Sequence, residues 1–144
     1  MTNLSVAENK ISSVKKYLSM LESYRNYSVE EIKGDPTLRG AIERYLYLAC
    51  QAVIDLAEVI ISVSQFRKPT TMGESFVILE EENVINAELK VKMARLVGFR
   101  NVLAHEYEEL NYEILYDVLR NRLQEITEFV KASEKFFNLK NVKI

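Results

Sequence analysis

Residues 35–64, DPTLRGAIERYLYLACQAVIDLAEVIISVS, determine the fold more than any other stretch of the chain. Asp35 can cap the free N–H groups at a helix start, and Pro36 suits the first helical turn. Apolar side chains then recur every three or four residues, which is typical of one face of a helix; they are Leu38, Ile42, Tyr45, Ala49, Val53, Leu56 and Ile60. The stretch predicts one long helix packed on a core.

The same helix carries a second, largely apolar line, which consists of Leu48, Ala52, Asp55 and Val59. Two apolar faces indicate that other parts of the protein pack on both sides of this helix. The rest of the bundle would pack on one side, and a second subunit is a candidate for the other. Asp55 needs a cationic partner there, because a lone carboxylate is costly in apolar surroundings. Gln51, Asp55 and Glu58 would also be costly in lipid, so we expect a buried helix of a soluble protein and no membrane span.

The remaining segments also have helical patterns. We expect a first helix over residues 5–24, with Ile11, Val14, Leu18 and Leu21 on one stripe, and a short turn at 28–34 with capping-box spacing. A loop at 67–73, a short helix at 74–82 and a break at 83–86 should follow. A fourth helix begins near Ala87, and Asn111 can cap a fifth. The fold class predicted is therefore all-α: a single domain, residues 1–144, forming an antiparallel bundle of four main helices plus a short helix.

Composition supports this fold class. Of 144 residues, 48% are hydrophobic and 28% charged, as in ordinary globular proteins, and only four glycines and two prolines interrupt the chain. A single cysteine, Cys50, cannot form an internal disulfide, and the N-terminus lacks the pattern of a secretory signal. These features predict a cytoplasmic protein.

The overall charge limits the classes of ligand. With 19 basic and 21 acidic residues, the formal net charge is −2. Proteins that bind nucleic acid mainly through charge are usually basic, because phosphate neutralisation supplies most of their non-specific affinity. Any nucleic acid that binds this chain must therefore use a locally positive site.

Arg100 occupies an unusual position in the fourth predicted helix. The inward residues of this helix are Leu89, Met93, Leu96 and Val97. Their spacing places Arg100 on the apolar stripe. Two structural interpretations fit: an aliphatic stem that covers the core with its head in solvent, or an ion pair with a carboxylate such as Asp55.

His105, the only histidine, follows five residues later. On an unbroken helix five residues correspond to a rotation of about 500°, so the two side chains would not share a face. They converge if the helix ends near Ala104, or if a second subunit brings its own pair into the cleft. No zinc-site spacing, phosphate-binding glycine loop or nucleophile elbow occurs, and we expect no metal or cofactor.

Residues 100–107, RNVLAHEY, match the R-x4-H-x-Y motif and resemble the HepT-like proteins of the HEPN group (higher eukaryotes and prokaryotes nucleotide-binding). The resemblance extends to the long helix at 38–64, to the loop and short helix at 68–85, and to Val97-Gly98-Phe99, so it covers nearly the whole chain. It implies an all-α HEPN bundle that forms a homodimer, with both motifs facing one cleft.

The resemblance also implies a function. The chain would be the toxin of a prokaryotic type VII toxin–antitoxin pair and a metal-independent ribonuclease. Its antitoxin would be a minimal nucleotidyltransferase that silences it by transferring AMP to the motif tyrosine, here Tyr107. The modification would add bulk and a negative phosphate beside Arg100.

The residue types suit this chemistry. An imidazole can exchange protons near neutral pH, and a guanidinium can grip two phosphate oxygens at once. We expect Arg100 and His105 to be catalytic, with the second histidine of a dimer as the other proton-transfer group and 2′,3′-cyclic phosphate ends as products. Asn101 is expected to support the site by orienting the loop or contacting the phosphate, or else to cap the helix end. Asp55 would hold Arg100 or satisfy a dimer contact.

Two other functions remain open at this point. The first is a non-catalytic HEPN module that presents nucleotide or RNA to a nucleotidyltransferase, which the acidic pI of about 5.6 favours slightly. The second is a bundle whose Arg–Asp contact is only structural. Both tRNA and mRNA remain open as substrates.

Overall fold

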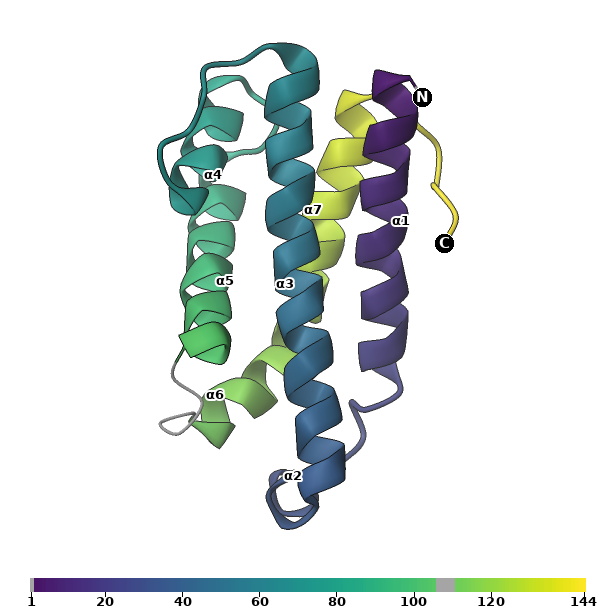
Figure 1. The fold of residues 1–144 in the computed structure, drawn as a ribbon, viewed down its shortest axis with the longest axis vertical. Coiled ribbons are helices and arrows are strands. Elements are labelled where there is room, and N and C mark those ends of the chain that lie inside the picture. Colours follow the sequence, from purple (N-terminus) through teal and green to yellow (C-terminus); the bar gives the residue numbers. More distant parts are fainter. Residues whose placement is uncertain (1, 106–110) are drawn as a thin grey trace.

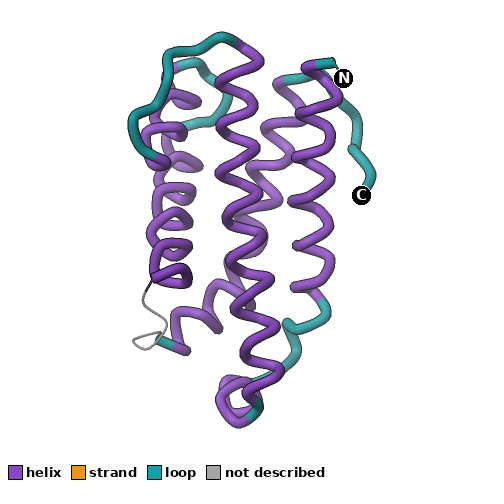
Figure 2. The backbone as a smooth tube through the Cα atoms, viewed as in Figure 1, coloured by secondary structure: helices purple, strands orange, loops and turns teal. Residues whose placement is uncertain are grey.

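The computed structural model describes residues 2–105 and 111–144, whose regular structure is helical throughout. Four long helices lie side by side and alternate in direction, as Figure 1 shows; they are α1 (Asn3–Glu22), α3 (Pro36–Ser64), α5 (Ala87–His105) and α7 (Leu123–Phe136). Shorter helices α2 (Val29–Gly34), α4 (Met72–Glu81) and α6 (Tyr112–Asp117) connect or flank them, and no strand is drawn in Figure 2. The predicted antiparallel all-α bundle is confirmed.

The central helix is α3, which packs against α1, α4, α5 and α7. Asp35 Oδ1 accepts hydrogen bonds of 3.1 Å from the backbone N–H groups of Thr37 and Leu38, so it caps the helix start as predicted. On the first predicted face, Ile42, Ala49, Val53, Leu56 and Ile60 are fully buried. By length and composition α3 could cross a membrane, but 56% of its most apolar window is buried within the protein, as in the core helix of a soluble bundle.

The second face of α3 is only partly covered. Ala52 is buried, whereas Leu48, Asp55 and Val59 are half-buried. This face therefore remains partly open in the single chain, alongside the α3 residues that reach Arg100.

Most helix boundaries lie close to the predicted ones, and their caps explain the differences. α1 begins two residues early because the Thr2 hydroxyl accepts a hydrogen bond of 3.1 Å from the Ser5 N–H. The capping box of α2 is present, with both Ser28–Glu31 bonds formed. α4 begins at Met72 because Thr71 caps it. Asn83, at φ 60°, ends that region in the left-handed conformation.

The fifth predicted helix is present and contains a π-helical turn. Asn111 caps it as expected, by accepting hydrogen bonds from the N–H groups of Glu113 and Ile114. A π-helical turn at Val118–Arg122, however, separates α6 from α7. Such a turn inserts extra backbone into a helix, and α6 accordingly runs obliquely beneath α7 in Figure 1. Apolar spacing could not reveal the turn, because buried residues recur at three and four on both sides of it.

Candidate active site

A cavity of about 680 Å³ lies between α3, the start of α4 and the C-terminal part of α5. Its lining includes Arg100 and His105, so the structure brings these two predicted site residues to one cavity. Both residues lie within α5, where Arg100 is half-buried and His105, in the last described turn, is exposed. The residues after His105 lie outside the described part of the chain, so both predicted routes to convergence, a helix end near Ala104 and a second subunit, stay predictions.

Three side chains hold the guanidinium of Arg100. Its Nε donates a hydrogen bond of 2.9 Å to Gln51 Oε1, its Nη1 one of 3.2 Å to Asn101 Oδ1, and its Nη2 one of 3.3 Å to Tyr47 Oη. A guanidinium has five N–H donors, so each Nη retains one N–H beyond these bonds. Two donors on a half-buried, oriented guanidinium suit a bidentate grip on phosphate oxygens.

Asp55 does not form the expected ion pair with Arg100. Its Oδ1 instead accepts a hydrogen bond of 2.9 Å from Gln51 Nε2. Gln51 Oε1 in turn accepts the hydrogen bond from Arg100 Nε, so the glutamine lies between the carboxylate and the guanidinium. Among residues 2–105 and 111–144, no carboxylate lies within ion-pair distance of Arg100. Within the described residues, the guanidinium is thus oriented through three neutral acceptors.

Asn101 lies inside α5 with a helical residue on either side, so it does not cap a helix end. Its side chain is exposed and accepts the hydrogen bond from Arg100 Nη1. The contact places Asn101 at the edge of the guanidinium that faces solvent.

Tyr107, the predicted AMPylation site, lies outside the described residues, as do Glu106, Glu108 and Glu109. Its modification stays a prediction. The described part of the chain contains no group of three or more His, Cys, Asp or Glu side chains with metal-site geometry.

Sequence reasoning missed the residues of α3 that contact Arg100. Tyr47 lies against two cations, with Arg100 Cζ 5.2 Å and Arg44 Cζ 5.7 Å from its ring centroid. Arg44, Tyr47, Gln51 and Asp55 are spaced by three, four and four, so they share one side of the helix. Polar residues at that spacing within so apolar a segment were the available signal.

Two further titratable groups lie near Arg100. Partial burial raises the pKa of the Glu43 carboxyl, an effect that Arg39 opposes, and Glu43 lines the cavity. Burial also raises the pKa of the Cys50 thiol to about 12, against the opposing charges of Arg122 and Arg100. Cys50 is fully buried and protonated at neutral pH, so it is a core residue and not a nucleophile.

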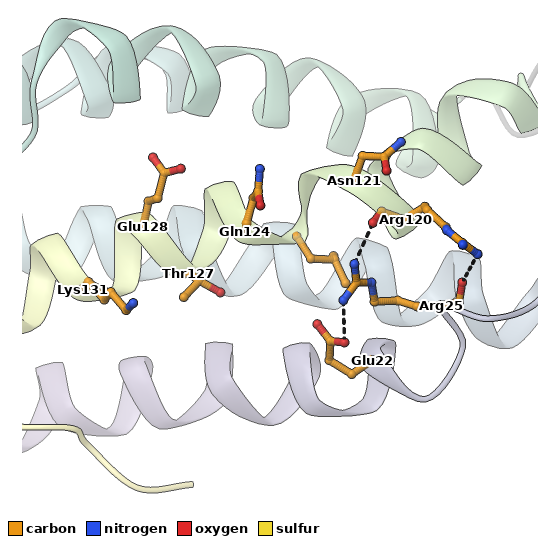
Figure 3. Close-up of a pocket in the computed structure, with 9 residues that line it drawn as sticks. Glu22, Arg25, Arg120, Asn121, Gln124, Thr127, Glu128 and Lys131 are labelled. Carbon is orange, nitrogen blue, oxygen red and sulfur yellow. Dashed lines mark hydrogen bonds and ion pairs between the residues drawn. The ribbon is translucent and has the colours of Figure 1, made fainter.

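A second cavity, of about 530 Å³, lies between the end of α1 and α7 (Figure 3). At its edge Arg25 Nη2 donates a hydrogen bond of 2.9 Å to the Arg120 carbonyl, and Arg120 Nη1 donates one of 3.1 Å to the Arg25 carbonyl. Arg25 also pairs with Glu22 at 3.0 Å. These contacts join the segment after α1 to the π-helical turn, and none of the predicted site residues lines this cavity.

Comparison with known proteins identifies the family of the chain. Residues 14–133 match the model of a family described as Ribonuclease HepT-like. The chain is 31% identical to the mRNA nuclease HepT of Shewanella oneidensis over 123 residues, covering 85% of this chain and 91% of that one. It is 28% identical to the tRNA nuclease HepT of Aphanizomenon flos-aquae over 138 residues, covering 94% of each.

A solved structure shares the fold. It contains the tri-AMPylated HEPN toxin of Shewanella oneidensis in complex with MNT antitoxin, and it superposes with a TM-score of 0.82 at 28% identity. The match covers 90% of this chain and 97% of the toxin.

Proposed function

The chain belongs to the HepT-like ribonuclease family, and we propose that it is the toxin of a toxin–antitoxin pair and cleaves RNA in the cavity between α3 and α5. The observation that carries this proposal is that Arg100, held by neutral acceptors, and His105 line the same cavity. A fixed cation with free donors and a proton-exchanging imidazole are two of the three groups that metal-independent cleavage of a phosphodiester uses.

The reaction uses the RNA's own nucleophile. The 2′-hydroxyl loses its proton and attacks the adjacent phosphorus, and the bond from phosphorus to the 5′-oxygen breaks. The departing oxygen takes up a proton, which leaves a 2′,3′-cyclic phosphate and a 5′-hydroxyl. Arg100 stabilises the charge that develops on the phosphoryl oxygens, and His105 serves one of the two proton transfers. No metal ion takes part in this scheme.

The second proton transfer needs another group, and a homodimer supplies His105 of a second copy of the chain. The half-buried second face of α3 supports this assembly, because Leu48 and Val59 leave apolar surface beside the Arg100 contacts. A single domain, residues 1–144, would then form each half of a cytoplasmic enzyme.

The partner is a minimal nucleotidyltransferase antitoxin that transfers AMP to Tyr107. The tyrosine oxygen attacks the α-phosphorus of ATP, pyrophosphate leaves, and the phenolic proton is released. Because Tyr107 follows His105 by two residues, the added phosphate carries negative charge close in sequence to the catalytic pair. The AMPylated state of the Shewanella oneidensis toxin supports this mode of control.

The proposal is tested by expressing the chain with and without an MNT antitoxin. When the chain is expressed without the antitoxin, we expect growth arrest and RNA fragments with cyclic phosphate ends. When the antitoxin is co-expressed, we expect the peptide that contains Tyr107 to gain the mass of one or more AMP units. A Tyr107→Phe variant should remain toxic with the antitoxin present. Intact tRNA and mRNA pools during growth arrest would contradict the proposal.

A further inference from the structure

Basic and aromatic side chains gather at one end of this acidic protein. The Tyr47 ring lies within 5.7 Å of Arg44 Cζ and 5.2 Å of Arg100 Cζ. The Tyr112 ring is flanked in the same way, with Lys33 Nζ at 6.0 Å and Arg39 Cζ at 5.9 Å from its centroid. Two tyrosine rings thus each have two cations beside them, in a chain whose net charge is −2.

The two groups are parts of one surface. Arg44 and Tyr47 line the cavity of Arg100 together with Glu43. Arg39 lies one helical turn before Glu43 on the same face of α3, and its charge acts on the Glu43 carboxyl. Tyr112 begins α6, and α2, which carries Lys33, contacts both α3 and α6. The surface therefore extends from the cavity toward the end of the bundle where α2, α6 and the start of α3 meet (Figure 1).

Few carboxylates among the described residues pair with these cations, and the one that Arg39 influences is Glu43, whose pKa is raised by burial against the opposing effect of the Arg39 guanidinium. Within the described ranges, neither Arg39 nor Arg44 has a carboxylate at ion-pair distance. Lys33 has only an exposed contact of 3.9 Å with Glu113, which contributes little in water. The cations are thus available to phosphates, and cation-flanked tyrosines offer rings on which unpaired bases can stack.

We propose that Lys33, Arg39, Arg44, Tyr47 and Tyr112 form a basic–aromatic track that holds single-stranded RNA on one side of the scissile phosphate. The inference rests on the proposed ribonuclease function and deepens it, because it defines the substrate as an unpaired strand that continues beyond the cavity along α3 to α6. The track also explains how a protein with a net negative charge can bind RNA, because it provides a locally positive site for the phosphates.

The track predicts how binding should respond to salt and to single substitutions. Loss of one phosphate contact to a single strand lowers the slope of log affinity against log salt by about 0.7, and loss of one stacked base weakens binding by roughly 5-fold or more. Substitution of a cation outside the track should change neither the salt slope nor the affinity. Lys131 is a matched control, because it is exposed on α7 beside the second cavity of Figure 3 and has no carboxylate at ion-pair distance in the described part of the chain.

The test measures fluorescence anisotropy of a labelled single strand of about 12 nucleotides, within the usual site sizes of such proteins. The full-length His105→Ala chain prevents cleavage during titration. In this background Arg39→Gln should reduce the salt slope and Tyr112→Ala should weaken binding, whereas Lys131→Gln should match the parent. Because Tyr112 also packs on the core, its variant is first compared with the parent by thermal unfolding.

Cleavage is measured in parallel, with His105 intact. Arg39→Gln should lower kcat/KM for the 12-nucleotide strand relative to that for a dinucleotide, while Lys131→Gln should leave this ratio unchanged. An unchanged salt slope and ratio for Arg39→Gln, or equal losses with Lys131→Gln, would overturn the track even if the parent cleaves RNA. The same would follow if the variants weakened capture of an antitoxin but not of RNA. A parent that binds the strand through the track yet cleaves no RNA would instead refute the ribonuclease function.

Discussion

Gln51 holds Arg100 through a hydrogen bond of 2.9 Å from the arginine Nε to the glutamine Oε1. The Gln51 amide cannot rotate by 180° without losing both hydrogen bonds, because its Nε2 donates to Asp55 Oδ1 at 2.9 Å. The carboxylate therefore fixes the amide, and the amide fixes the guanidinium. This arrangement orients the cation without neutralising it, which a direct Asp55–Arg100 pair would have done.

The first prediction concerns Gln51 as a positioning residue. Gln51→Leu removes the acceptor and lets the guanidinium move, so we expect kcat for RNA cleavage to fall roughly 10- to 100-fold, as for other small misplacements of catalytic groups. The variant should still fold, and unfolding in urea should show only the cost of the two hydrogen bonds that Gln51 makes, to Arg100 and to Asp55.

Gln51→Glu separates positioning from a purely structural role. Its carboxylate would pair with Arg100 and should depress activity at neutral pH. Protonation of this carboxyl at lower pH restores a neutral acceptor, so the activity relative to wild type should rise as the pH falls. If the activity of Gln51→Glu relative to wild type does not change with pH, Gln51 does not position the arginine for catalysis.

The second prediction concerns Cys50. Its pKa is raised by burial from 9.0 to about 12, so the native state keeps the thiol proton between these values while the unfolded state loses it. Stability should therefore decline as the pH rises above about 9, and Cys50→Ala should remove that part of the decline. Urea unfolding at a series of pH values measures both.

The rate at which thiol reagents modify Cys50 is a second test of its burial. Cys50 should react slowly in the native protein at pH 8 and rapidly in urea, because it is fully buried when folded. Rapid modification of the folded protein would contradict this packing.

The third prediction concerns the core. Phe76 of α4 and Phe129 of α7 are fully buried and meet edge to face, with ring centroids 5.5 Å apart. Phe129→Ala should lower the free energy of unfolding by about 3–5 kcal/mol, as large-to-small core substitutions do. The matched control is Val77→Ala on the exposed side of α4, where we expect a change below about 1 kcal/mol. Equal effects of the two variants would contradict the α4–α7 packing.

The architecture was predictable because its signals are local. The Asp35 cap, the Ser28–Glu31 capping box and the apolar periodicity of α3 each specify a helix through neighbouring residues. The π-helical turn at Val118–Arg122 was not predictable, because it keeps the three- and four-residue recurrence of apolar side chains on both sides.

The candidate site was predictable only in part. The motif gave Arg100 and His105, but their meeting at one cavity also depends on how α3 and α4 pack beside α5, which spacing left open. Tyr47 and Gln51 depend on how α3 packs against α5, and periodicity gives the face of each helix but not the register between two helices. The Asp55–Arg100 ion pair was a reasonable expectation from charge, yet an intervening glutamine replaces it.

The most direct test of the account is end-group analysis of a labelled single-stranded RNA incubated with purified protein in excess EDTA. Wild type, Arg100→Ala and His105→Ala should be purified identically, with matching helical circular dichroism. We predict that wild type generates 2′,3′-cyclic phosphate and 5′-hydroxyl ends and that both variants lose at least about 100-fold in rate. Cleavage that stops in EDTA, or that persists unchanged in Arg100→Ala and His105→Ala, would contradict the claim that these two residues form a metal-independent active site.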